Sequence, residues 1–161
     1  MEGKQLQAVA PSIRMGEMLV TGDGLKLQTL LGSCVGLALY DRRRKVGGLA
    51  HIVLPESRGR TTKHGKFVDT AIPQLIEKMN ALAGEQVKPI AKLAGGASMF
   101  STNVTTQIGQ QNIEACETLL RQLGIPIVAR HCGGEKGRRM LLDTTDGRVR
   151  IEIVGHDAVE L

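Results

Sequence analysis

The chain has 161 residues, enough for one compact domain with a hydrophobic core. Its 42% hydrophobic and 23% charged residues are typical of globular proteins and exclude a disordered or fibrous chain. The net charge of +5 favours an acidic partner, but no aromatic residues accompany the scattered basic ones, so we expect a negatively charged protein and no nucleic acid.

Apolar runs predict strands in the first third of the chain. We expect residues 1–12 to form a loose lead-in and Leu25–Leu31 to form a short strand. Cys34–Tyr40 and Val46–Leu54 are almost entirely apolar, which is typical of strands buried on both faces. The charged loop Asp41–Arg44 between them has hairpin length, and we interpret it as a solvated tip.

Two helices are predicted farther along. Asp69 or Thr70 caps the first, whose apolar residues follow the helical period and whose first turn contains Pro73. The second covers Ile108–Leu123 and ends at Gly124. Four further strands are expected, over Lys88–Leu93, Ile125–Ala129, Arg139–Leu142 and Arg148–Val154. The predicted fold class is therefore α/β, of the α+β kind: one domain over residues 1–161, with a sheet-rich layered core and helices packed on the outside.

The predicted hairpin brings a thiol and an imidazole together. If a four-residue loop joins its strands, Tyr40 faces Lys45 and Cys34 stands directly opposite His51. Directly opposed residues share a face, with Cβ atoms about 4.5–5.5 Å apart. The pairing depends on the register of the two strands, since a slip of one residue alters which side chains share a face.

A cysteine beside a histidine has the chemistry of an activated nucleophile. The imidazole takes the thiol proton and later returns it to a leaving group. Gly32 and Ser33 allow a sharp turn before Cys34, so that backbone N–H groups there can face a developing oxyanion. A cysteine or histidine on a buried strand is usually a structural residue, however. These residues alone leave a catalytic and a structural role about equally open.

Longer motifs carry a resemblance to a known family. They lie in order from about residue 15 to residue 150, namely Leu30–Gly36 (LLGSCVG), Ala50–Pro55 (AHIVLP), Asp69–Pro73 (DTAIP), Ala91–Phe100 (AKLAGGASMF), Ile108–Asn112 (IGQQN), Gly124–Val128 (GIPIV) and Gly133–Arg139 (GGEKGRR). With these motifs the chain resembles the chemoreceptor glutamine deamidase (CheD) family. The resemblance implies a fold related to cysteine-hydrolase deamidases and no metal or organic cofactor.

The resemblance also implies site residues. The family nucleophile falls on Cys34 and its histidine on His51. The third catalytic residue of the family is a threonine, usually six residues before the cysteine. That slot holds Gln28, so we assign the orienting role to the adjacent Thr29 and keep Gln28 as the alternative. Gly32 and Ser33 fall in the oxyanion loop.

The implied reaction converts receptor glutamines to glutamates through a cysteine thioester. The resemblance also implies that receptor methyl esters are hydrolysed by the same route. The implied partners are the cytoplasmic helical bundle of chemoreceptors and, in some bacteria, a CheC-type phosphatase. Two alternatives stay open. One is a non-catalytic chemotaxis adaptor, which Gln28 in the threonine slot favours. The other is a cysteine hydrolase that acts on another amide.

The remaining sequence features concern the compartment and the other cysteines. No apolar run is long enough to span a membrane, the N-terminus lacks a secretory pattern, and three cysteines without CxxC spacing suit a reducing compartment. We therefore expect a cytoplasmic protein that does not insert into membranes. Cys116 falls on the apolar stripe of the second helix, as a core thiol does. His131 and Cys132 are too far in sequence from the other histidines for a zinc site to be expected.

Overall fold

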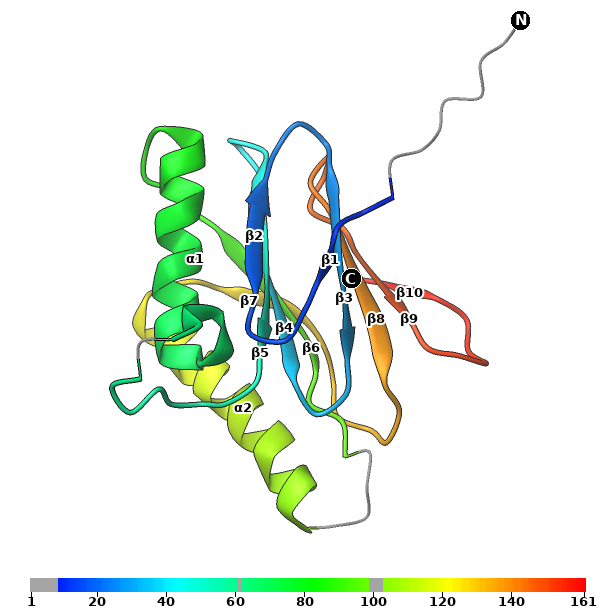
Figure 1. Ribbon diagram of the computed structural model, residues 1–161. Helices are drawn as coiled ribbons and strands as arrows, with labels where there is room; N and C mark the ends of the chain where they lie inside the picture. Colours follow the sequence, from blue (N-terminus) through cyan, green and yellow to red (C-terminus); the bar gives the residue numbers. More distant parts are fainter. Residues whose placement is uncertain (1–8, 61, 99–102) are drawn as a thin grey trace, which may run out of the picture.

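Two β-sheets lie face to face, and two helices cover one of them (Figure 1). The structure is a computed structural model that describes residues 9–60, 62–98 and 103–161. Within these ranges it contains two α-helices and two mixed sheets of five strands each. The predicted α+β class with a sheet-rich core is confirmed, whereas a relation to cysteine hydrolases stays a prediction.

The sheet under the helices, here called the inner sheet, has the order β2 (Met18–Thr21), β5 (Val46–Ile52), β4 (Val35–Asp41), β6 (Ile90–Gly95) and β7 (Ile127–Cys132). The other sheet, here called the outer sheet, has the order β1 (Ser12–Ile13), β3 (Lys26–Leu31), β8 (Arg138–Asp143), β9 (Val149–Glu152) and β10 (Val159–Glu160). All strands expected from the apolar runs exist, and β6 and β7 end two to three residues later than predicted.

Three short strands, β1, β2 and β10, were not predicted. Each has only two to four residues, too few to show a periodic pattern, and pairing with a longer neighbour defines it. Part of the expected loose lead-in is therefore attached to the outer sheet, because the N–H of Gln28 on β3 donates to the carbonyl of Pro11. Residues 1–8 of that lead-in lie outside the described residues.

The helices are α1 (Val68–Ala83) and α2 (Asn103–Gln122), and a short 3₁₀ turn, η1 (His64–Lys66), precedes α1. The capping prediction for α1 is wrong: its N-cap is Phe67, without a side-chain hydrogen bond, and Pro73 lies beyond the first turn. Asp69 does not cap because its carboxylate accepts hydrogen bonds from Ser57. Helix α2 starts five residues earlier than predicted. Neither helix is long and apolar enough, over the residues described, to cross a membrane.

Two apolar layers hold the stack together. One lies between the helices and the inner sheet, and the other lies between the two sheets. Strand β4 supplies both layers: Val35, Leu37 and Leu39 face the helices, whereas Ala38 and Cys34, the residue just before the strand, face the outer sheet. All seven residues of β4 and of β5 are buried, as the continuous apolar runs predicted.

The hairpin of β4 and β5 has a different register from the one predicted. Asp41 pairs with Val46 and Gly36 pairs with His51, so Cys34 is not directly opposite His51. The turn begins one residue later because the Asp41 carboxylate accepts the N–H groups of Arg43 and Arg44. The register differs by two residues, and side chains alternate with a period of two, so Cys34 and His51 still share the face toward the outer sheet.

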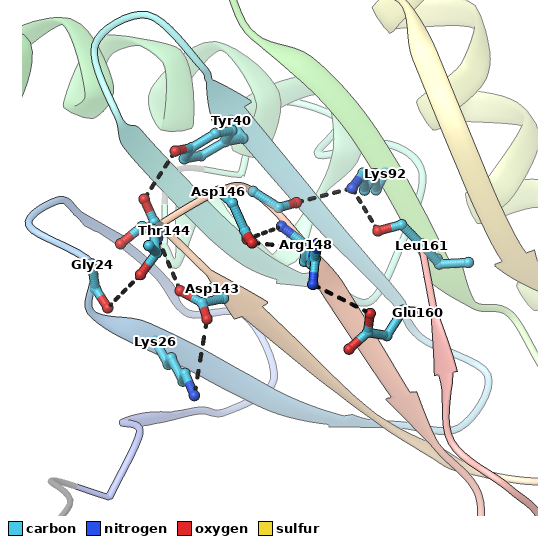
Figure 2. A network of polar contacts seen from close by, with 12 residues as sticks. Gly24, Lys26, Tyr40, Lys92, Asp143, Thr144, Asp146, Arg148, Glu160 and Leu161 are labelled. Atoms are coloured by element: carbon cyan, nitrogen blue, oxygen red, sulfur yellow. Dashed lines mark hydrogen bonds and ion pairs between the residues drawn. The ribbon is translucent and has the colours of Figure 1, made fainter.

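A polar network joins the two sheets at the end far from Cys34 (Figure 2). The Tyr40 hydroxyl, on the inner sheet, donates to the carbonyl of Thr144 just after β8. The Lys92 ammonium, on β6, donates to the carbonyls of Gly147 and Leu161. Because these acceptors belong to the outer sheet or its turns, the network fixes the spacing of the sheets at this end.

We predict that Tyr40→Phe lowers the free energy of unfolding by about 1–2 kcal/mol, because the buried Thr144 carbonyl loses its donor. Urea denaturation at pH 7 measures the change. Thr145→Val is the matched control, since the Thr145 hydroxyl is exposed and makes only a long contact with Gly24. Equal stabilities of Tyr40→Phe and the wild-type protein would contradict a joining role for this hydroxyl.

Candidate active site

The candidate site lies between the sheets, at the end opposite the polar network. Cys34 directly precedes β4, and His51 is the sixth residue of β5. Cys34 is diagonal to His51 across the hairpin, a relation that places Cα atoms about 7–8 Å apart and Cβ atoms somewhat closer. Gly36 is the residue directly opposite His51, so no side chain of β4 stands between the thiol and the imidazole on this face.

Thr29 reaches His51 from the other sheet. It lies in the middle of β3, and its hydroxyl oxygen is 2.7 Å from Nδ1 of His51. The same hydroxyl donates to the carbonyl of Ile13 on β1, at 2.6 Å. Gln28 points the other way, and its amide donates to the carbonyl of Ala10. Of the two residues left open by the sequence, Thr29 is therefore the one in contact with the imidazole.

These contacts assign the tautomer of His51. The single hydroxyl proton of Thr29 goes to Ile13, so the Thr29 oxygen accepts a proton from Nδ1–H of the imidazole. The other ring nitrogen, Nε2, is then unprotonated in the neutral ring. Nε2 is buried and has no hydrogen-bond partner among the described residues. The lone pair on Nε2 is therefore available to accept a proton from a group that approaches it.

Burial keeps both groups neutral in the resting protein. Cys34 is 9% exposed and His51 is 4% exposed. Desolvation raises the pKa of the Cys34 thiol above that of an exposed cysteine. Desolvation also lowers the pKa of His51, although the Ile13 carbonyl and the Glu17 carboxylate act in the opposite direction. The pair is thus a thiol and a neutral imidazole, and a proton has to move when the thiol reacts.

The loop that carries Cys34 is held by a glycine-rich loop after β6. The N–H of Gly96 donates to the carbonyl of Cys34, and the N–H of Ala97 donates to the carbonyl of Gly32. A Cβ atom on Gly95 would lie 2.2 Å from the Cys34 carbonyl oxygen, and the Gly95 φ of 102° also excludes other residues. Within the described chain the N–H groups of Ser33 and Cys34 donate no hydrogen bond outside the strand ladders. Two donors next to the thiol thus have no acceptor among the residues that the structure describes.

Arg138, for which no role was predicted, supports this glycine-rich loop through the turn that precedes β8. It is 5% exposed, and its guanidinium donates to the carbonyls of His131, Gly133 and Lys136. The turn it fixes is bonded to the glycine-rich loop by the pairs Gly133 N–H to Gly95 O and Ser98 N–H to Gly134 O. In the sequence only the two arginines after a glycine pair (GGEKGRR) pointed to Arg138. A side chain that donates to several backbone carbonyls has no characteristic sequence motif.

Asn112 is a second residue that the sequence did not single out for the site. It is fully buried on α2, and its side-chain amide donates to the carbonyl of Val53. Val53 directly follows β5, and its side chain packs against the apolar cluster that contains Cys34, so Asn112 fixes the backbone beside that cluster. The signal was an amide within the apolar stripe of a helix, a position where a polar residue needs a specific partner.

The other singled-out residues lie away from the site. Cys116 is fully buried in the layer between helices and sheet, as predicted, and desolvation raises the pKa of its thiol far above that of an exposed cysteine. His131 accepts a hydrogen bond from Arg138 at Nδ1. No group of three metal-ligating side chains occurs within the described ranges. Met99 and Phe100 of the AKLAGGASMF motif lie outside those ranges.

Comparison with known proteins defines the family. Residues 53–153 match the family described as CheD chemotactic sensory transduction. The chain is 43% identical over 141 residues to a probable chemoreceptor glutamine deamidase CheD of Methanococcus vannielii, covering 86% of this chain and 92% of the relative. A protein of the same name from Clostridium botulinum is 49% identical over 142 residues, with coverages of 84% and 88%. The chain belongs to the CheD family.

The CheD family predicted from the collinear motifs is thereby confirmed. The segment matched to the family begins at residue 53, after Thr29, Cys34 and His51. The assignment of roles to these three residues therefore rests on the contacts described above. In this CheD chain they come from three places in the fold: β3 of the outer sheet, the loop before β4, and β5 of the inner sheet.

We predict that protonation of His51 makes the CheD stability depend on pH. The pKa of His51 is lowered in the folded chain, so below about pH 6.5 the unfolded chain binds a proton that the folded chain does not. The stabilisation by neutral His51 is present above that pH and is lost as the pH falls through the folded-state pKa. Urea denaturation from pH 7.5 to pH 5 should show the stability difference between wild type and His51→Asn changing in favour of the variant.

His131→Asn is the control for this measurement, because burial and Arg138 lower the pKa of His131 too. Its pH-dependent change should add to that of His51→Asn, since the two imidazoles have separate partners. A stability difference between wild type and His51→Asn that stays constant over this range would contradict a lowered pKa at His51.

Proposed function

We propose that this protein deamidates glutamine side chains of chemoreceptors, with Cys34 as nucleophile and His51 as general base. The observation that carries the proposal is the free Nε2 of a buried His51 whose Nδ1–H is held by Thr29, on the same face as the thiol. The relatives named above are called probable chemoreceptor glutamine deamidases, which supports the substrate. No step of the reaction needs a metal or organic cofactor.

In the first half of the reaction Cys34 Sγ attacks the carbonyl carbon of the glutamine amide. His51 Nε2 takes the thiol proton, and the Thr29 oxygen stabilises the imidazolium through Nδ1–H. The unoccupied N–H groups of Ser33 and Cys34 are oriented by the Gly32–Cys34 loop and stabilise the tetrahedral oxyanion. The imidazolium then protonates the departing nitrogen, the C–N bond breaks, and ammonia leaves a glutamyl thioester.

In the second half His51 Nε2 accepts a proton from water, and the resulting hydroxide attacks the thioester carbonyl. The C–S bond breaks, the imidazolium returns the proton to Cys34 Sγ, and glutamate is released. A methyl ester passes through the same thioester with methanol as leaving group, so receptor methylesterase activity belongs to the proposal. We place the reaction in the cytoplasm, where it acts on the helical bundle of the receptor.

The non-catalytic adaptor is the second candidate, with the receptor or a CheC-type phosphatase as its partner. Gln28 in the threonine slot favoured it, because a missing third residue would leave the histidine unoriented. The hydrogen bond from His51 to Thr29 orients the imidazole, so this argument for the adaptor no longer applies and an enzyme is supported. Binding of a CheC-type phosphatase is compatible with either candidate.

We predict that the protein raises the mass of a chemoreceptor cytoplasmic fragment by about one dalton per target glutamine, as expected when an amide becomes an acid. Cys34→Ala should abolish the reaction. Cys132→Ser is the matched control and should retain it, because the Cys132 side chain packs in the layer toward the helices, on the opposite face of the inner sheet from Cys34. Turnover by Cys34→Ala would rule out this nucleophile, and a wild-type protein that binds the fragment without turnover would establish the adaptor.

We predict that Thr29→Val lowers kcat at least about tenfold, because the imidazole loses the oxygen that holds its tautomer. Thr29→Ser should restore most of the rate, since it keeps the hydroxyl. Gln28→Ala should be close to wild type, because the Gln28 amide contacts Ala10 and not His51. A larger loss in Gln28→Ala than in Thr29→Val would reverse the assignment.

Alkylation of Cys34 tests the neutral resting pair. Because burial raises the pKa of Cys34 and lowers that of His51, the thiolate fraction at pH 7 is small. The rate of reaction with iodoacetamide, followed on the Cys34 peptide by mass spectrometry, should rise steadily from pH 6 to pH 9. A rate that is already constant between pH 6 and pH 8 would show a preformed thiolate–imidazolium pair instead.

A further inference from the structure

A groove lined by cations lies at the end of the inner sheet opposite Cys34. Its volume is about 660 Å³, and it runs between the β4–β5 turn, the start of β6 and the edge strand β7. Five basic residues line it: Arg42, Arg43, Arg44, Lys88 and Lys92. The sequence interpretation of the arginine run as a solvated tip left out Lys88 and Lys92, which only the fold brings to the same place.

The positive charge of this groove is not compensated from within. Asp41 is the one acidic residue in its lining, and it is 2% exposed. Although burial alone raises the pKa of the Asp41 carboxyl, hydrogen bonds from the N–H groups of Lys88 and Arg44 and from the Arg44 guanidinium hold that pKa below its usual range. Asp41 is therefore an anion whose acceptor sites are already occupied, and the side chains of Arg42, Arg43 and Lys88 make no ion pair with it.

Three of the five cations are available to a partner. Arg44 is paired with Asp41 and Glu85. Lys92, whose contact with Leu161 is drawn in Figure 2, donates to the carbonyls of Gly147 and Leu161. The exposed side chains of Arg42, Arg43 and Lys88 have no hydrogen bond or ion pair with any described residue. The available charges are thus two guanidinium groups and one ammonium group on long, exposed side chains.

The chemistry of the lining selects an acidic protein surface. Guanidinium groups bind carboxylates in a bidentate manner, and an open groove of long side chains suits several carboxylates on one surface. Nucleic acid is disfavoured because the one aromatic residue in the lining, Tyr40, is buried and its hydroxyl is bonded to Thr144. The apolar wall of Ile90 and Val128 gives the groove a face for the apolar side chains of such a partner.

We propose that this groove is a second docking site for the substrate protein, and that it binds an acidic stretch of the chemoreceptor distant from the target glutamine. The inference rests on the proposed deamidase function. From Cys34 to Asp41 the strand β4 spans about 23 Å, at about 3.3 Å per residue. A helix covers that length in about 15 residues, so a helical substrate longer than this is long enough to reach from the catalytic site to the groove.

The test compares two double variants with the same change in charge. Each Arg→Glu or Lys→Glu change removes one positive and adds one negative charge, so Arg42→Glu/Arg43→Glu lowers the net charge from +5 to +1. The control Lys78→Glu/Arg121→Glu makes the same change at exposed positions of α1 and α2 that do not line the groove. Both are made in the Cys34→Ala protein, so that binding of a chemoreceptor cytoplasmic fragment is measured without turnover.

The groove variant should raise the Kd for the receptor fragment about tenfold and reduce its dependence on salt, whereas the control changes the Kd less than about twofold. With Cys34 present, the groove variant should raise KM for the fragment and leave kcat unchanged. On an eight-residue peptide around a target glutamine it should equal wild type, because such a peptide cannot reach the groove.

Equal weakening by the two double variants would overturn the docking site, because it would show an effect of net charge alone. The same conclusion follows if the fragment does not bind, or if the groove variant loses affinity for a homopolymeric RNA and not for the fragment. The deamidase proposal fails separately. If the wild-type protein shows no turnover, but the groove variant in the Cys34→Ala protein still loses affinity for the fragment, the docking site is kept and the reaction is excluded.

Discussion

The hydroxyl of Thr29 is the contact on which the candidate site depends. It lies between two sheets, accepting from the imidazole of His51 on the inner sheet and donating to the carbonyl of Ile13 on the outer one. An unpaired hydroxyl in this apolar layer would be costly, and the hydrogen bond to Ile13 avoids that cost. The same pairing sets the His51 tautomer, and folding of the two sheets against each other therefore prepares the base.

The sites at the two ends of the sheets differ in what holds them. At the Tyr40 end, side-chain donors from the inner sheet join carbonyls of the outer sheet. At the Cys34 end, the loop of the nucleophile is fixed by backbone hydrogen bonds from the glycine-rich loop, which the Arg138 clamp supports in turn. With this arrangement the N–H groups of Ser33 and Cys34 beside the thiol meet no acceptor in the described part of the chain.

The sequence predicted the fold class, the buried strands and the shared face of Cys34 and His51, because these follow from apolar runs and a period of two. It did not predict the register, since the start of the turn is set by hydrogen bonds to the Asp41 carboxylate. It assigned the orienting role to Thr29 but could not exclude Gln28, because the two neighbours differ in the face of β3 they occupy. Arg138 and Asn112 bond to backbone carbonyls of distant segments, and such contacts leave no local pattern.

The protonation of the His51 ring tests the central claim most directly. Nitrogen-15 NMR of the imidazole at pH 7.5, in wild type and in Thr29→Val, distinguishes the two neutral tautomers. In the wild type Nδ1 should carry the proton and Nε2 should be unprotonated, and Thr29→Val should lose this preference. A wild-type ring protonated at Nε2 would contradict the account, because the nitrogen proposed to accept the Cys34 proton would already hold one.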